Sequence, residues 1–345
     1  MDQLTHTEAL PRIRVIIVNY NGRAFLPRCF EALAAQTFAD FETVAVDNAS
    51  TDGSAALSLP DSRFRWLRLD RNWGFAAGNN AGATGFDGEW IVTLNPDAFP
   101  QPDWLERLMA AVDRHPGITM LGSTQIDAGH PEILDGSGDC FFALGLPWRG
   151  NNGHSLSDLP PEGEVFGPCA AAAAYSARRF HELGGFDERF FCYYEDVDLA
   201  FRMRLAGGRC IQVADAVVHH VGSGIAGRTS PFVHFHSARN RVWLFVKNMP
   251  SWALWLLLPG HLVLNCALLA WGAKRGHGRA VLDGMIEAVA GLGPVWADRR
   301  RIQAERKVSA MAVLTALCWS PMTMLQRRHD VRPSHGKSAS PHFVG

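Results

Sequence analysis

Four short apolar segments in the first hundred residues each end in polar residues, and this alternation constrains the fold more than any other feature. The segments are 14–20, 42–47, 65–69 and 90–94. Helical apolar spacing follows the first at 24–36, and further helical stretches are expected near 53–58, 74–85 and 102–114. Strands and helices that alternate in this way build a doubly wound, mostly parallel sheet. The sequence therefore predicts an α/β domain that binds its ligands beyond the carboxyl ends of the strands.

Polar side chains stand at three of these strand ends. Asn19 and Asp47 end the first and second segments, and Asp97 follows the fourth. Because the carboxyl ends of parallel strands share one edge of a sheet, we expect the three to converge on one crevice. A carboxylate at position 47 can accept the imide N–H of a uracil or thymine ring. The alternative is that all three are ordinary turn residues.

A glycine-containing segment at 72–80 is a candidate diphosphate site. It reads NWGFAAGNN, so that Asn72, Gly78 and Asn79 lie at the start of a predicted helix. Glycine permits close approach of the backbone to a ligand, and a helix N-terminus favours phosphate. The alternative is a plain helix start with small residues chosen for packing.

A divalent cation site is predicted at Asp97, which directly follows Pro96. One carboxylate oxygen can hold Mg²⁺ or Mn²⁺, with phosphate oxygens and water completing the shell. His219 and His220 follow an apolar strand at 211–218, and one of them is a candidate second ligand. The alternative is a pair of solvated or core histidines.

Two adjacent carboxylates, Glu195 and Asp196, begin a predicted helix that runs to about residue 206. One of them can remove a proton from an attacking hydroxyl group while the other hydrogen-bonds the acceptor. The alternative is that acidic residues here only complement the helix dipole.

Composition bounds the class of protein. The chain has 345 residues, 19% of them charged, and a net charge of −1, which excludes wholesale disorder and any global basic field for nucleic acid. Its seven cysteines form no C-x-x-C pair, so they indicate buried thiols of a cytosolic protein rather than zinc ligands. The first fourteen residues lack the apolar segment of a signal peptide, and the catalytic body is expected in the cytoplasm.

The C-terminal region is apolar and then basic. Residues 248–273 carry no formal charge and include Trp252, Trp255 and Trp271, while Pro259-Gly260 interrupts the run. From residue 274 onward, twelve Lys and Arg face five Asp and Glu. This pattern favours a monotopic or re-entrant membrane-associated hairpin. A true span, and a soluble helix pair that covers the sheet or forms a homodimer interface, are the alternatives. The expected divisions are a flexible start at 1–11, a catalytic domain at 12–248, a helical region at 249–330 and a disordered tail at 331–345.

Several segments together resemble the family 2 glycosyltransferases, and within them the rhamnosyltransferase-like subgroup. These are VIIVNYNG, VDNASTDGS, NWGFAAGNN, LNPDA, GGFDERFFCYYEDVDLAFRMRLAGG and VVHHVGS, in the family's order, between about residues 12 and 248. The resemblance implies the GT-A fold and transfer of one sugar from a nucleotide donor, with inversion at the anomeric carbon.

The resemblance also implies roles for single residues. Asp196 matches the general base and Glu195 the acceptor-orienting residue beside it. The other matches are Asp47 for reading the base, Asn19 and Asn79 around the nucleotide, Asp97 for the last position of the metal-binding D-x-D, His220 for the metal- and phosphate-contacting histidine, and Arg239 for the arginine of the family's Arg-Asn pair.

Two departures from the family pattern matter. The first D-x-D position is Asn95, so the metal's identity, Mg²⁺ or Mn²⁺, stays open. The processive motif Q-x-x-R-W is absent, which favours addition of a single sugar. The resemblance implies dTDP-rhamnose or a UDP-sugar as donor. It also implies a lipid-linked or polysaccharide acceptor of the cell envelope, reached from the cytoplasmic face of the inner membrane.

Two rival functions were weighed against this one. A sugar-phosphate nucleotidyltransferase needs a long Gly-rich basic loop after the first strand, and 19–23 is too short for it. An inactive glycan-binding scaffold on a membrane would not need Asp97, Glu195 and Asp196 together.

Overall fold

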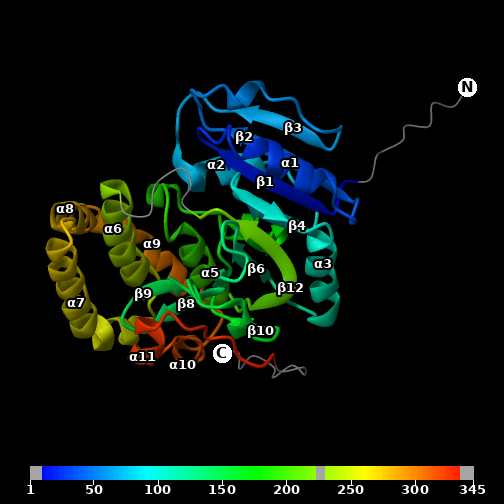
Figure 1. The fold of residues 1–345 in the computed structure, drawn as a ribbon. Helices are drawn as coiled ribbons and strands as arrows, with labels where there is room; N and C mark the ends of the chain where they lie inside the picture. Colours follow the sequence, from blue (N-terminus) through cyan, green and yellow to red (C-terminus); the bar gives the residue numbers. More distant parts are fainter. Residues whose placement is uncertain (1–9, 223–229, 335–345) are drawn as a thin grey trace, which may run out of the picture.

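A ten-stranded mixed sheet forms the centre of the computed structural model, which describes residues 10–222 and 230–334. The strand order is β10-β12-β6-β11-β4-β1-β2-β3, with β5 paired to β12 and β7 to β6 (Figure 1). A separate hairpin is formed by β8 and β9. The strands are β1 Ile13–Asn19, β2 Phe41–Asp47, β3 Phe64–Arg68, β4 Trp90–Leu94, β5 Ala98–Pro100, β6 Met120–Asp127, β7 Leu134–Ser137, β8 Asp139–Phe142, β9 Leu146–Arg149, β10 Gly163–Val165, β11 Ala172–Ser176 and β12 Cys210–His220.

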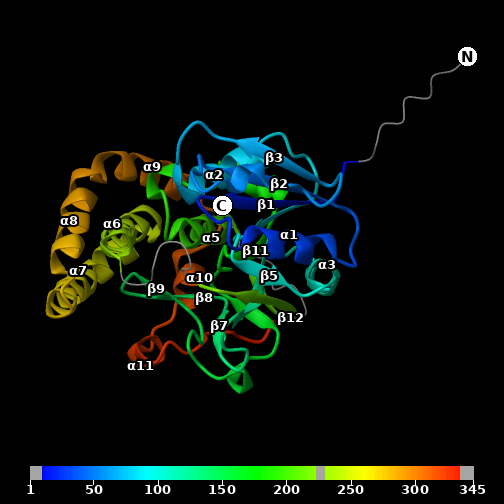
Figure 2. The same cartoon turned by 45° about the horizontal axis from the view of Figure 1, so that its top comes forward.

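The helices divide into those that cover the sheet and those that follow it. The sheet is covered by α1 Leu26–Ala34, α2 Gly74–Ala83, α3 Trp104–Arg114, α4 Ala177–Glu182 and α5 Glu195–Leu205. After β12 come α6 Pro231–Asn248, α7 Ser251–Lys274, α8 Gly278–Ala290, α9 Leu292–Ala304, α10 Ala310–Thr315 and α11 Pro321–Leu325. Figures 1 and 2 place α6 to α9 together on one side of the sheet, away from β3 and α1.

Alternation along β1 explains why both faces of the sheet are covered. Ile13, Val15 and Ile17 pack into the cluster that holds α1 and α3, whereas Ile16 and Val18 pack into the cluster that holds α2, α4 and α5. The three strands β4, β1 and β2 pair in parallel, and β3 extends this parallel half. The predicted doubly wound parallel sheet is confirmed for this half. Strand β11 is antiparallel to both β4 and β6.

Most predicted elements lie within two residues of the observed bounds. The main difference is at 53–58, where only a single 3-10 turn forms, at Ser54–Ala56. The region 122–165 holds most of β6 and all of β7 to β10, and β8 and β9 form the hairpin.

The prediction that Pro259-Gly260 breaks the apolar run is wrong. Helix α7 is 24 residues long and continues through Pro259 without a break. A Cβ added to Gly260 would lie 2.7 Å from Leu144 Cδ2, so the glycine lets the helix pack closely on the segment after β8. Tertiary packing therefore offsets the ~3 kcal/mol that an interior proline costs a helix.

The predicted division at residue 248 falls inside one hydrophobic cluster. That cluster includes Phe201 of α5, Leu244 of α6, Leu254 of α7 and Ala288 of α8. The helical region is thus continuous in its packing with the helix that begins at Glu195.

The chain ends are described only in part. Arg332 pairs with Glu164 through backbone hydrogen bonds in both directions, so the predicted disorder of 331–345 is wrong for 331–334. The rest of that tail, and the predicted flexible start apart from residues 10 and 11, lie outside the described residues.

Candidate active site

The polar residues that end β1 and β2 lie opposite each other in the register of the sheet. Asn19 is fully buried, and its Nδ2 donates to the hydroxyl groups of Ser54 and Ser50 at 2.8 and 3.0 Å. Its Oδ1 accepts from the N–H of Gly22 at 3.0 Å. Both ends of the Asn19 amide are therefore used to join the two loops, and its role is to shape the strand-end crevice.

Asp47 keeps one carboxylate oxygen available. Its Oδ1 accepts from the N–H of Ser50 at 3.2 Å and lies 3.5 Å from Asn19 Nδ2. In the described part of the chain, no hydrogen bond reaches Asp47 Oδ2. A carboxylate oxygen at the end of a parallel strand can accept an N–H from a bound ring. The geometry is compatible with the predicted role of Asp47 in reading the base.

Asn72 is held in the loop before α2 by its neighbours. Its Oδ1 accepts from Asn48 Nδ2 at 3.0 Å and from the N–H of Gly74 at 2.9 Å. Asn48 also accepts the N–H of Trp73 through Oδ1 at 2.9 Å. Asn72 therefore fixes the loop through its oxygen, and its partly exposed position leaves the amide nitrogen at the crevice.

Gly78 and Asn79 are packing residues of α2. A Cβ added to Gly78 would lie 2.7 Å from Val18 Cγ1, so the helix needs glycine here to approach β1. Asn79 is fully buried, and its Nδ2 donates to the carbonyl of Phe75 at 2.9 Å. The geometry assigns both residues a packing role, at the contact of α2 with β1 and within α2, and their contact with a nucleotide stays a prediction.

Three buried side chains meet at the end of β12. His220 Nδ1 lies 2.7 Å from Asp135 Oδ2, and His220 Nε2 lies 3.3 Å from Asp97 Oδ1. Burial by itself lowers the pKa of His220, but the hydrogen bonds to the two carboxylates outweigh it, and that pKa is raised. The sequence predicted the pairing of Asp97 with His220, whereas Asp135 was not foreseen.

These residues fit a divalent cation. A carboxylate on Nδ1 fixes an imidazole so that Nε2 can serve as a metal ligand, and Asp135 stands in that relation to His220. Carboxylate oxygen is a preferred ligand of Mn²⁺, whereas imidazole suits this ion less well but is tolerated. Asn95, which stands at the first D-x-D position, lies beside these candidate metal ligands, because its Nδ2 is 3.3 Å from His220 Nε2.

A cavity of about 220 Å³ lies between the β8–β9 hairpin and the start of α5. Carboxyl groups and aromatic rings dominate its lining, which includes Asp139, Glu195, Asp196, Phe75, Trp148, Tyr193 and Tyr194. Asn95, two residues before Asp97, also lines it and connects it to the candidate metal ligands.

The two carboxyl groups at the start of α5 differ in their surroundings. Asp196 accepts two backbone N–H groups, from Ala170 at 3.0 Å and from Val197 at 2.8 Å. Burial raises the pKa of Asp196, and these two hydrogen bonds oppose the rise. Glu195 is buried, and within the described residues its Oε2 has no hydrogen-bond partner. Burial, followed by the charge of Asp196, raises the Glu195 pKa well above its usual range.

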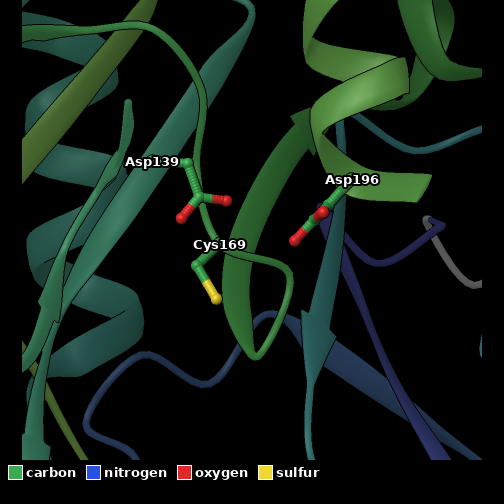
Figure 3. A group of neighbouring side chains, drawn as sticks. All are labelled: Asp139, Cys169 and Asp196. Atoms are coloured by element: carbon green, nitrogen blue, oxygen red, sulfur yellow. The ribbon is translucent and has the colours of Figure 1, made fainter. Parts of the chain in front are cut away.

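Asp196 faces a second carboxylate from the hairpin. Figure 3 shows the side chains of Asp139, Cys169 and Asp196 turned toward one another, and one ligand atom of each lies within 4.8 Å of the others. Burial raises the pKa of the Cys169 thiol to about 12, so the sulfur is not a thiolate. The guanidinium of Arg149 acts electrostatically on all three groups. A neutral thiol beside an arginine makes this cluster a poor cation site.

A strained loop aims the first turn of α5. Phe191, Tyr193 and Tyr194 have φ values of 63°, 71° and 67°, a region that costs ~1–3 kcal/mol for non-glycine residues. Asn240 of α6 holds this loop, because its Nδ2 donates to the carbonyls of Phe190, Cys192 and Tyr193 at 2.9, 3.0 and 2.8 Å.

Arg239 serves the same loop. Its guanidinium donates to the carbonyls of Arg189 and Phe190 at 2.9 and 3.0 Å and lies over the ring of Trp243. The predicted contact of Arg239 with the nucleotide is corrected by this arrangement, since the donor groups are turned inward. The loop also contacts α2, which begins in the segment predicted to bind the nucleotide. The N–H of Ala76 in α2 donates to the carbonyl of Phe191 at 3.2 Å.

Comparison with known proteins finds a family match in the N-terminal half of the chain. Residues 14–183 match the family described as "Glycosyl transferase family 2". The N-acetylglucosaminyl-diphospho-decaprenol L-rhamnosyltransferase of Mycobacterium tuberculosis is 28% identical over 297 residues, which cover 76% of this chain and 95% of that protein.

Solved structures share the GT-A fold. The mannosyltransferase PcManGT from Pyrobaculum calidifontis, in complex with GDP-Man and Mn²⁺, superposes with a TM-score of 0.52 at 19% identity, covering 89% of this chain and 87% of that one. S. aureus TarS 1-349 in complex with UDP-GlcNAc gives a TM-score of 0.53 at 15% identity, covering 97% and 99%.

Proposed function

Because residues 14–183 belong to glycosyl transferase family 2, we propose that this nucleotide-sugar-dependent glycosyltransferase is an inverting, non-processive enzyme. It moves one sugar, L-rhamnose from dTDP-rhamnose, to a lipid-linked glycan during synthesis of a cell-envelope polysaccharide. The sugar and acceptor class follow the name of the mycobacterial relative. The observation that carries the proposal is Asp196, a carboxylate held by two backbone N–H groups in an open cavity.

Asp196 is the general base of the proposed reaction. It takes the proton of the attacking acceptor hydroxyl, whose oxygen then bonds to the anomeric carbon as the bond to the nucleotide diphosphate breaks on the opposite face. A base of raised pKa is better matched to this transfer near neutral pH than an ordinary carboxylate. Glu195 is buried, and its pKa is raised more than that of Asp196. Its carboxyl group hydrogen-bonds the sugar acceptor.

The donor lies along the strand-end crevice in this proposal. Asp47 Oδ2 accepts the imide N–H of the base, while Asn19 and Asn72 keep the crevice in shape. Asp97 and His220 would hold Mg²⁺ or Mn²⁺, which when bound stabilises the negative charge of the leaving diphosphate.

The decisive experiment offers the purified protein dTDP-rhamnose and an N-acetylglucosaminyl-diphospho-polyprenol, and follows the product by mass spectrometry. Asp196→Asn keeps the shape of the side chain but cannot accept the proton, and we expect transfer to fall ~10²–10⁴-fold with donor binding retained. Asp113→Asn, at an exposed carboxylate of α3, is the matched control. Undiminished transfer by Asp196→Asn would contradict the assignment.

We also propose that α7 rests on the cytoplasmic face of the inner membrane. By length and composition this helix is long and apolar enough to cross a bilayer, yet only 28% of its most apolar window is buried. Trp252, Trp255 and Trp271 are 50%, 62% and 52% exposed, as interfacial tryptophans are. The buried positions recur at helical spacing and pack on the protein, so the apolar remainder is left for lipid.

Vesicle flotation tests the membrane proposal. The full chain should float with vesicles that contain anionic lipid, and Val263→Asp, at a residue 70% exposed on α7, should reduce the floating fraction. Leu10→Asp, at a leucine 64% exposed outside the C-terminal helices, is the matched control. A full chain that stays in the soluble fraction as a dimer would support the homodimer alternative and overturn this one.

A further inference from the structure

Asp139 is a buried carboxylate that the roles above leave unused. It begins β8, pairs with Arg149 in the register of the hairpin, and is 7% exposed. Across residues 10–222 and 230–334, no hydrogen bond or ion pair reaches its carboxylate oxygens. The charge of Arg149 acts on Asp139 from the same hairpin, but a buried carboxyl group that accepts no hydrogen bond is still costly, so its presence calls for an explanation.

The carboxylate of Asp139 lies on the opposite wall of the cavity from the proposed base. Asp139 comes from the β8–β9 hairpin and Asp196 from α5, yet atoms of the two carboxyl groups approach within 4.8 Å (Figure 3). Glu195 Oε2 is a second buried acceptor without a partner beside them. Acceptor oxygens that converge on one cavity from two walls match a ligand with several hydroxyl groups.

The remaining walls supply the other half of a sugar site. Trp148 is next to Arg149 on the hairpin, and Tyr193 and Tyr194 precede α5. Aromatic rings offer flat apolar surface, which suits the C–H face of a pyranose, while carboxylates accept from its hydroxyl groups. The cavity has a volume of about 220 Å³, which leaves room for a single sugar ring. It is open to solvent.

We propose that Asp139 is an acceptor-binding residue that receives a hydrogen bond from the hydroxyl adjacent to the attacking one, so that the cavity selects pyranosides with vicinal hydroxyl groups. The proposal rests on the function proposed above and names the acceptor's reacting unit. Asp139 and Asp196 contact neighbouring oxygens of the same ring, and only the proton on the attacking oxygen passes to Asp196.

Binding is tested apart from transfer. The probe is p-nitrophenyl N-acetyl-β-glucosaminide, titrated into the unaltered protein saturated with dTDP and Mn²⁺ and followed by saturation-transfer NMR. Asp139→Asn and Asp139→Ala should weaken probe binding about tenfold or more, the effect of losing a hydrogen bond to a charged group. Asp158→Asn, at a mostly exposed carboxylate, should bind as the unaltered protein does.

The outcomes separate the two proposals. Probe binding that depends on Asp139, with no rhamnose transfer, would retain the acceptor site and refute the donor assignment. Probe binding unchanged in both Asp139 variants, or no binding by the unaltered protein, would overturn the role of Asp139. Affinity for dTDP measures correct folding of each variant, and a loss of dTDP affinity equal to the loss of probe affinity would assign Asp139 a structural role and overturn the proposal.

Discussion

Asn240→Ala is expected to disable catalysis while leaving the donor site intact. The amide of Asn240 donates to three loop carbonyls directly before Glu195 and Asp196. It has two N–H groups, each worth ~0.5–1.5 kcal/mol, and the buried carbonyls left unpaired cost ~1–3 kcal/mol more. That sum, about 2–6 kcal/mol, overlaps the total of about 3–9 kcal/mol for the three loop residues of positive φ at ~1–3 kcal/mol each.

Loss of the amide therefore removes about as much free energy as the loop needs to hold its strained shape. A shift of ~1 Å in a reacting group can cost ~10²-fold in rate. We expect kcat to fall ~10- to 100-fold, with the affinity for dTDP and Mn²⁺ changed less than about threefold. The assays are steady-state transfer, isothermal titration with the nucleotide, and the denaturant midpoint of each variant.

A matched control separates positioning from stability. Asn151→Ala removes another buried asparagine, which donates to the carbonyl of Asp158 at 2.7 Å and accepts the N–H of His329 at 2.8 Å. Both variants should lose similar stability, but only Asn240→Ala should lose kcat. Equal losses of kcat in the two variants, or none in Asn240→Ala, would refute the loop-clamping argument.

Three further predictions follow from the site and from the buried ion pairs. EDTA should abolish transfer and Mn²⁺ or Mg²⁺ should restore it, with Asp97→Asn needing a higher metal concentration; full activity in chelator would exclude the metal. Activity should decline on acidification at a higher pH than for an ordinary carboxylate, because burial raises the Asp196 pKa and the base must be ionised; a decline only near pH 4 would contradict this. The Asp187 side chain is 10% exposed, and its pairs with Arg189 and Lys247 outweigh the effect of partial burial and lower its pKa. It therefore contributes stability above its unfolded-state pKa that is lost as pH falls through the folded-state pKa. In urea unfolding, Asp187→Asn should therefore be less stable than the unaltered protein at neutral pH. This difference in unfolding free energy should become small at low pH.

The strand ends could be predicted because they depend on local sequence. A β-branched run that stops at Asn19 or Asp47 contains its own boundary, and parallel topology then brings these ends together. The helix that starts at Glu195 was likewise predictable from its acidic first turn and terminal glycines.

The hairpin side of the site could not be predicted because it depends on distant partners. Asp135 meets His220 across 85 residues of sequence, and nothing near Asp135 or Asp139 repeats with a strand or helix period. Isolated carboxylates in a Gly-rich region are common, and only the fold places these two against a histidine and a second carboxylate. The run Asp135-Gly136-Ser137-Gly138-Asp139 is the one available signal, and it is weak.

The direction in which a side chain points could not be predicted from the sequence either. Arg239 stands at the position the family pattern marks, but its guanidinium turns toward the loop carbonyls. Pro259 is a helix breaker by local rules, and contact with the protein overrides it.

The shared cluster beneath α5 has a consequence for how the molecule unfolds. Lys247 of α6 pairs with Asp198 of α5 at 2.9 Å, and Arg299 of α9 donates to the carbonyls of Val246 and Met249 at 2.8 and 2.6 Å. These contacts join α6 to α5, and α9 to the C-terminal end of α6. Calorimetry should therefore record one cooperative transition for α5 and α7 together. If α7 rests on a bilayer as proposed, release that loosens α7 would then be felt at Asp196, the proposed base, and the membrane would act as part of the enzyme's scaffold.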